Sequence, residues 1–192
     1  MISNIHRAIF IHVPKSGGSS IEQCLLNNEF HYSGSHIHQT HKQILRDQTL
    51  ERHFTFAFVR NPWDKMVSEY KWFTNTTYDW PKKHVKNYFS ECTFSNFVSM
   101  FLNSNVGDVY HRLSFTEILN PICDMSFIGR FENLQHDFNI VCDKIGMPQQ
   151  QLPHVYKTDH KHYTEYYDDE TRQIVAERYA KDIERFGYKF GE

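Results

Sequence analysis

Two short apolar segments, each followed by a turn that can open a helix, constrain the fold of this chain most strongly. Residues 8–13 (AIFIHV) and 54–59 (FTFAFV) are rich in β-branched and aromatic side chains, as expected of strands inside a sheet. Helical periodicity follows both segments. Because strands that alternate with helices form a mainly parallel sheet, the sequence predicts an α/β fold. Ligands bind beyond the carboxyl ends of such strands.

The turn after the first strand, residues 14–20 (PKSGGSS), has the composition of an anion-binding loop. Its proline ends strand pairing because it has no N–H to donate, and its glycines let the main chain approach a ligand closely. Ser19 and Glu22 have capping-box spacing, which predicts the start of a helix. The N–H groups at a helix N-terminus bind phosphate-like anions, and Lys15 adds a positive charge. The order differs from that of a Walker loop, in which the lysine follows the last glycine.

The turn after the second strand repeats this arrangement. Asn61 can cap a helix, and Pro62 suits its first turn. Arg60 lies at the mouth of the turn, where its planar guanidinium can bind phosphate through two hydrogen bonds. Ser68 lies on a different helix face from the residues predicted to be buried, which are Trp63, Met66, Val67 and Tyr70. Two anion sites of this kind suit a ligand with phosphate at both ends.

Together the two segments resemble the sulfotransferase superfamily, whose donor is 3′-phosphoadenosine 5′-phosphosulfate (PAPS). The first turn is similar to the family's 5′-phosphosulfate loop, which would comprise Pro14, Lys15, Ser16, Gly17, Gly18, Ser19 and Ser20. Arg60 and Ser68 resemble its 3′-phosphate site. Similarity in residues 127–138, 152–154 and 182–188 extends the resemblance over most of the chain. It points to the carbohydrate branch, which includes heparan sulfate 2-O-sulfotransferase; Lys65 is a departure, because relatives often carry arginine there.

The resemblance implies a single P-loop-like domain over residues 1–192, with a mainly parallel sheet flanked by helices. It also implies transfer of a sulfuryl group from PAPS to a hydroxyl of a carbohydrate acceptor. Lys15 would neutralise charge on the leaving phosphate, by the logic of phosphoryl transfer. Lys157 is assigned to the 3′-phosphate, because a related loop closes over that group in the family.

A histidine is expected to accept the proton of the acceptor hydroxyl. Residues 28–50 are polar and rich in histidine. The sequence around His38 matches a His-x-Thr element of relatives, and the 2-O-sulfotransferase uses a histidine base, so His38 is the first candidate. His36, His41 and Glu29 remain alternatives.

Other interpretations of these residues stay open. His36 and His38 share a face if their segment is extended and could form a metal pair, but no third ligand is evident, so no metal is expected. His12, within the first strand, is expected to be a hydrogen-bonded core residue. A P-loop-like kinase and a non-catalytic nucleotide- or glycan-binding protein are the alternative functions.

Composition narrows the class of protein further. A formal net charge of −2 gives no global field for nucleic-acid binding. The four cysteines lack C-x-x-C spacing, which argues against a zinc knuckle or a disulfide framework and for reduced thiols. No apolar run reaches the length of a membrane span. Eukaryotic Golgi members of the family that this chain resembles carry a transmembrane anchor, so the resemblance implies a soluble, cytoplasmic protein of bacterial or viral type.

The remaining elements are predicted from periodicity and from helix-ending signals. The expected elements are a helix near residues 43–52, helical signals over 94–102, a short strand at 126–129, a helix over 134–145 closed by Gly146, and one helix over 169–186.

Overall fold

The computed structural model of the chain describes residues 1–32, 52–74, 83–106, 108–120, 125–155 and 161–192. These residues group into two compact units. The first comprises Met1–Arg60 and Phe115–Lys157, and the second comprises Asn61–Ser114 and Thr158–Glu192. The single domain expected over residues 1–192 stays a prediction, as does the helix near residues 43–52, most of which lies outside the described residues.

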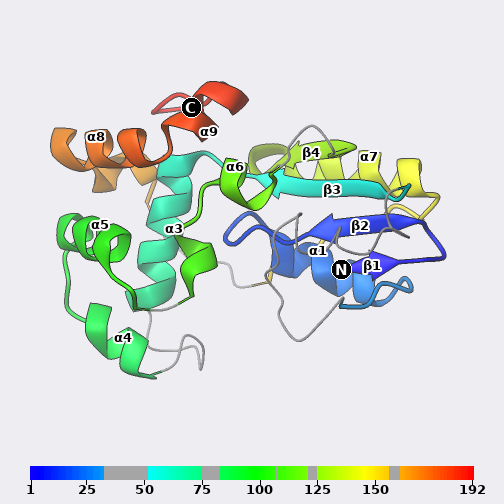
Figure 1. Cartoon of the computed structure of the whole chain (residues 1–192), viewed down its shortest axis with the longest axis horizontal. Coiled ribbons are helices and arrows are strands. Elements are labelled where there is room, and N and C mark those ends of the chain that lie inside the picture. Colours follow the sequence, from blue (N-terminus) through cyan, green and yellow to red (C-terminus); the bar gives the residue numbers. More distant parts are fainter. Residues whose placement is uncertain (33–51, 75–82, 107, 121–124, 156–160) are drawn as a thin grey trace. The chain divides into compact units, whose positions relative to one another are not determined.

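The first unit is built on one sheet, in which the described strands have the order β1-β2-β3-β4 (Figure 1). The strands are β1 (Ile2–Ser3), β2 (Ala8–Ile11), β3 (Phe54–Val59) and β4 (Phe127–Arg130). β1 pairs antiparallel with β2, whereas β2, β3 and β4 run parallel. Helix α1 (Gly18–Leu26) follows β2 and α7 (Leu134–Ile145) follows β4; the short α6 (Phe115–Ile118) precedes β4. The predicted α/β fold with a mainly parallel sheet flanked by helices is confirmed.

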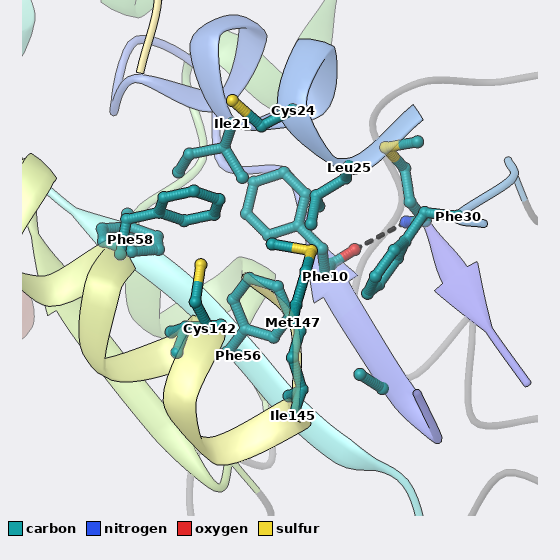
Figure 2. Close-up of a cluster of buried hydrophobic side chains, with 14 of the residues drawn as sticks. Phe10, Ile21, Cys24, Leu25, Phe30, Phe56, Phe58, Cys142, Ile145 and Met147 are labelled. Atoms are coloured by element: carbon teal, nitrogen blue, oxygen red, sulfur yellow. Dashed lines mark hydrogen bonds between the residues drawn. The ribbon is translucent and has the colours of Figure 1, made fainter. Parts of the chain in front are cut away.

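The core of this unit lies between one face of the sheet and the helices α1 and α7. Figure 2 shows Phe10 of β2 and Phe56 and Phe58 of β3 packed with side chains from both helices. The Phe10 and Phe56 rings lie 5.2 Å apart, measured between centroids. Each fully buried side chain of this kind stabilises the fold by about 1.5–3 kcal/mol.

Helix α7 has the predicted bounds because its end is set by a local signal. Gly146 takes the left-handed conformation, with φ of 67°, and its N–H donates to the carbonyl of Cys142. Cys24 and Cys142 are buried in the core of the first unit, and burial raises the pKa of Cys142 to about 11. Such a thiol is unreactive at neutral pH.

The second unit is helical in its described residues. It contains α3 (Pro62–Thr74), α4 (Lys83–Phe89), α5 (Phe94–Asn103), the 3₁₀ turns η2 (Val109–His111) and η5 (Tyr163–Tyr166), α8 (Asp169–Arg178) and α9 (Ala180–Phe186). Asn61 caps α3 as predicted, since its Oδ1 accepts the N–H of Trp63 at 3.1 Å. The core is aromatic, and the rings of Phe73, Phe89, Phe97 and Phe101 contact one another.

The prediction of one helix over residues 169–186 is wrong, because the helix breaks at Tyr179. The Tyr179 side chain is fully buried, and its main chain leaves the helical region at φ −110° and ψ 24°. Arg178 donates to the carbonyl of Arg112 at 2.8 Å, which fixes the chain at the break. Burial of one large ring here outweighs continuity of the helix.

Lys65, where relatives often carry arginine, has a structural role in the second unit. Its side chain is 1 % exposed, and its Nζ donates to Oε1 of Glu69 at 3.1 Å and to the carbonyl of His111 at 2.6 Å. Nδ1 of His111 lies 2.7 Å from the other Glu69 oxygen. Burial opposes the charge, but Tyr179, Glu69 and Asp182 together raise the pKa of Lys65. Removing one member would leave a buried charge unpaired.

None of the helices in the described part of the chain is long and apolar enough to cross a membrane. The cytoplasmic location stays a prediction.

Candidate active site

The parallel pairing of β2 and β3 places the two predicted anion-binding turns at one edge of the sheet. Ile11, the last residue of β2, pairs with Ala57, and β3 ends two residues later at Val59, so both turns follow the carboxyl ends of neighbouring parallel strands. A guanidinium nitrogen of Arg60, Nη1, donates to the main-chain carbonyl of Lys15 at 3.0 Å. The structure therefore brings together a lysine and an arginine that are 45 residues apart in the sequence.

The loop at residues 14–20 bends through two residues with positive φ. Lys15 has φ of 62° and Gly17 has φ of 81°. A left-handed conformation is unfavourable for lysine, and such strain persists only where the surroundings impose it. The hydrogen bond from Arg60 to the Lys15 carbonyl is one such constraint.

The predicted capping box of Ser19 and Glu22 is wrong. Helix α1 begins at Gly18 with Gly17 as its N-cap, and no side chain caps it. Glu22 instead lies against His12, with 2.9 Å between its Oε1 and Nδ1 of the imidazole. Because the N-cap Gly17 offers no side-chain cap, the first N–H groups of α1 suit a bound anion.

His12 is a buried residue beneath the loop, as predicted, and is 7 % exposed. Its ring lies directly against Gly18, because a Cβ built on Gly18 would overlap the imidazole. Gly18 is therefore required here for close packing on His12.

Tyr32 also interacts with Glu22. Burial raises the pKa of Tyr32 most, and the negative charge of Glu22 and a hydrogen bond with it raise this pKa further.

The serines of the loop differ in their surroundings. Ser20 accepts a hydrogen bond from the N–H of Val155 at 3.4 Å, which joins the loop to the segment after residues 152–154. Ser16 is 1 % exposed, and its hydroxyl has no hydrogen-bond partner within the described ranges. Most buried polar groups have a partner, so the Ser16 hydroxyl remains available for a hydrogen bond as far as the described residues are concerned.

Phe131 is a site residue that the sequence analysis missed. Its ring lies beneath the Arg60 guanidinium, with 3.9 Å from Cζ to the ring centroid. It begins the short turn η4 (Phe131–Asn133) after β4. The resemblance in residues 127–138 pointed to this segment, but no local pattern indicated which side chain would contact Arg60.

The positions of the other predicted site residues relative to this loop stay predictions, except for that of Glu29. Ser68 is buried in α3 of the second unit, 5 % exposed. Glu29 is exposed in the turn beyond the far end of α1, a helix of about 13 Å, which disfavours it as a base near Lys15. Outside the described residues lie His36, His38, His41 and Lys157.

No group of three or more potential metal ligands occurs in the part of the chain that the structure describes. The possible pair of His36 and His38 lies outside that part.

Comparison with known proteins decides the family. The sequence model of the sulfotransferase family matches residues 1–189. The chain belongs to the sulfotransferase family. The predicted resemblance to this family is thereby confirmed.

The chain is similar to human carbohydrate sulfotransferase 9, with 25% identity over 218 residues. The match covers 96% of this chain and 48% of the human protein, so the chain spans about half the length of that relative. An uncharacterized protein of Archaeoglobus fulgidus is 33% identical over 102 residues, which cover 51% of this chain and 72% of the archaeal one. No solved structure matches the chain.

The contact between Gly18 and His12 predicts a specific rescue. Gly18→Ala should destabilise the protein by about 1–3 kcal/mol, because the added methyl group overpacks the imidazole. In a His12→Ala background the same substitution should cost much less. Urea unfolding of the wild type, both single variants and the double variant measures this coupling. An equal cost of Gly18→Ala in both backgrounds would show that the two residues do not pack as described.

Proposed function

We propose that the protein transfers the sulfuryl group of PAPS to a hydroxyl of a carbohydrate acceptor. The observation that carries the proposal is the hydrogen bond from Arg60 to the carbonyl of Lys15. It joins the two turns that would bind opposite ends of a bisphosphorylated donor. Membership of the sulfotransferase family supports this donor, because PAPS is its usual co-substrate.

The residues of the first turn fit the 5′-phosphosulfate group. The N-terminus of α1 carries no side-chain cap, and a buried Ser16 hydroxyl has no described partner. Both features suit the oxygens of an anion. Pro14, Gly17, Gly18, Ser19 and Ser20 complete the proposed loop.

The 3′-phosphate is assigned to Arg60, Ser68 and Lys157. Arg60 offers planar, paired donors that match phosphate geometry. The kinase alternative is disfavoured, because Lys15 precedes the glycines, contrary to the order in a Walker loop.

In the proposed reaction, the acceptor hydroxyl oxygen attacks sulfur and forms a new S–O bond. The bond between sulfur and the bridging oxygen breaks, and its electron pair leaves with the 5′-phosphate of adenosine 3′,5′-bisphosphate. Lys15 stabilises the negative charge that develops there. His38 accepts the hydroxyl proton, with His36 as the second candidate.

A carbohydrate is the proposed acceptor because the similar human protein is described as a carbohydrate sulfotransferase. No metal is required by this mechanism. A non-catalytic nucleotide- or glycan-binding protein would bind the same donor without transfer.

Donor recognition can be tested by thermal stability. Adenosine 3′,5′-bisphosphate should stabilise the protein by roughly 2.7 kcal/mol at ~100 times its dissociation constant, whereas AMP at the same concentration should stabilise it much less. AMP lacks the 3′-phosphate that Arg60 and Ser68 are proposed to bind. Equal thermal shifts with the two nucleotides would contradict that assignment.

Lys15→Ala should lower turnover by about 100-fold, the usual effect of losing one preorganised charged donor. Binding of adenosine 3′,5′-bisphosphate should fall less, because main-chain N–H groups still contact the phosphate. Lys144→Ala, which removes an exposed lysine from α7, is the matched control and should retain turnover. Wild-type turnover in Lys15→Ala would remove Lys15 from the mechanism.

His38→Ala should lose ~10²–10⁴-fold in turnover but still bind adenosine 3′,5′-bisphosphate. Because a general base must be neutral, activity should fall as pH drops through the histidine pKa, ordinarily about 6.5. His36→Ala and His41→Ala are the controls. Full activity in His38→Ala together with an essential His36 would reassign the base, and loss of activity with a chelator would indicate a metal.

A further inference from the structure

We propose that Phe131 is a positioning residue that sets the preference of this protein for nucleotides with a 3′-phosphate. Its ring holds the Arg60 guanidinium against the loop at residues 14–20, so that Arg60 is ordered before the ligand arrives. This inference rests on the proposed function, in which Arg60 binds the 3′-phosphate.

The sheet register places Phe131 beside Arg60. Val59 pairs with Arg130 in the parallel ladder of β3 and β4, and the next residues along the two chains are Arg60 and Phe131. Cζ of Arg60 lies 3.9 Å from the ring centroid, well inside the range of about 6 Å for a cation–π contact.

The same ring also contacts the anion-binding loop. A Cβ built on Gly17 would lie 3.3 Å from Cδ2 of Phe131, and closer still to the methyl groups of Leu134. Phe131 thus packs under the left-handed turn at Gly17 and under Arg60 at once. The hydrogen bond from Arg60 to the Lys15 carbonyl closes this arrangement.

The turn that carries Phe131 is itself fixed. Oδ2 of Asp137, on the first turn of α7, accepts the main-chain N–H of Arg130 at 2.7 Å. The sheet register and this hydrogen bond together fix the position of the main chain directly before Phe131. The ring position is therefore set by structure outside the loop.

Preorganisation explains how a phenylalanine can affect selectivity. A free arginine side chain has many rotamers, and ordering them on binding lowers affinity. Arg60 is held on one side by the Phe131 ring and at Nη1 by a carbonyl, so its guanidinium is already restricted. Removing the ring should weaken binding of the 3′-phosphate through Arg60, whereas any effect on the loop at residues 14–20 would be shared by the two nucleotides, since both carry a 5′-phosphate, and would cancel in the ratio of their dissociation constants.

The test compares two dissociation constants, for adenosine 3′,5′-bisphosphate and for AMP, measured by calorimetry. Phe131→Leu should reduce the preference for the bisphosphate by about tenfold, since leucine is apolar but has no π face. Phe131→Tyr retains the ring face and should keep the wild-type preference. Phe127→Leu, in the strand β4 that precedes Phe131, is the matched control: Phe127 packs against the core, so its loss should lower stability without changing the preference.

A second comparison tests whether Phe131 acts through Arg60. In an Arg60→Gln background, which removes the cation over the ring, Phe131→Leu should cause no further change in the preference. An unchanged preference in Phe131→Leu, or an equal loss in both backgrounds, would overturn the inference. If Phe131→Leu does not fold, the ratio of the two dissociation constants is measured for Phe131→Met instead. A wild-type protein without any preference for the bisphosphate would instead contradict the proposed function.

Discussion

The parallel pairing of β2 with β3 is the constraint on which the candidate site depends. It places the carboxyl ends of the two strands side by side, so that Arg60 can donate to the carbonyl of Lys15. The pairing of β3 with β4 adds Phe131 beneath the same arginine. Lys15, Arg60 and Phe131 therefore follow three neighbouring strands, β2, β3 and β4, and form a single cluster although they lie far apart in the sequence.

This arrangement uses local geometry rather than overall charge. The formal net charge of the chain is −2, so a large net positive charge does not contribute to the proposed binding of an anionic donor. The loop instead offers an uncapped helix N-terminus, a lysine and an ordered arginine at one sheet edge. His12 and Glu22 support the loop from below, where the close approach of Gly18 to the imidazole leaves no room for a side chain.

Much of the fold could be predicted from the sequence because its signals are local. Residues 8–11 and 54–59 are recognisable as buried strands from their side chains alone, and Gly146 ends α7 where expected. The errors arose where a distant partner decided the outcome. Glu22 pairs with His12 rather than capping α1, and burial of Tyr179 breaks the helix predicted over residues 169–186.

In the candidate site, too, local signals could be predicted from the sequence and contacts with distant partners could not. The sequence patterns around Lys15 and Arg60 indicated anion binding, but they did not show that the two residues are joined by a hydrogen bond. The contact of Phe131 with Arg60 depends on strand register, which no single segment reveals. In the second unit, the buried group of Lys65, Glu69 and His111 was missed for a similar reason, since charged residues are rarely expected in a core.

Sulfuryl transfer is the central claim, and a transfer assay tests it most directly. The protein would be incubated with PAPS labelled at sulfur and a panel of carbohydrates, and in parallel with ATP labelled at the γ-phosphate and magnesium. The account predicts that label passes from PAPS to at least one carbohydrate and that none passes from ATP. Transfer from ATP would show a kinase, and tight binding of PAPS with no transfer to any acceptor would indicate a binding protein without catalysis.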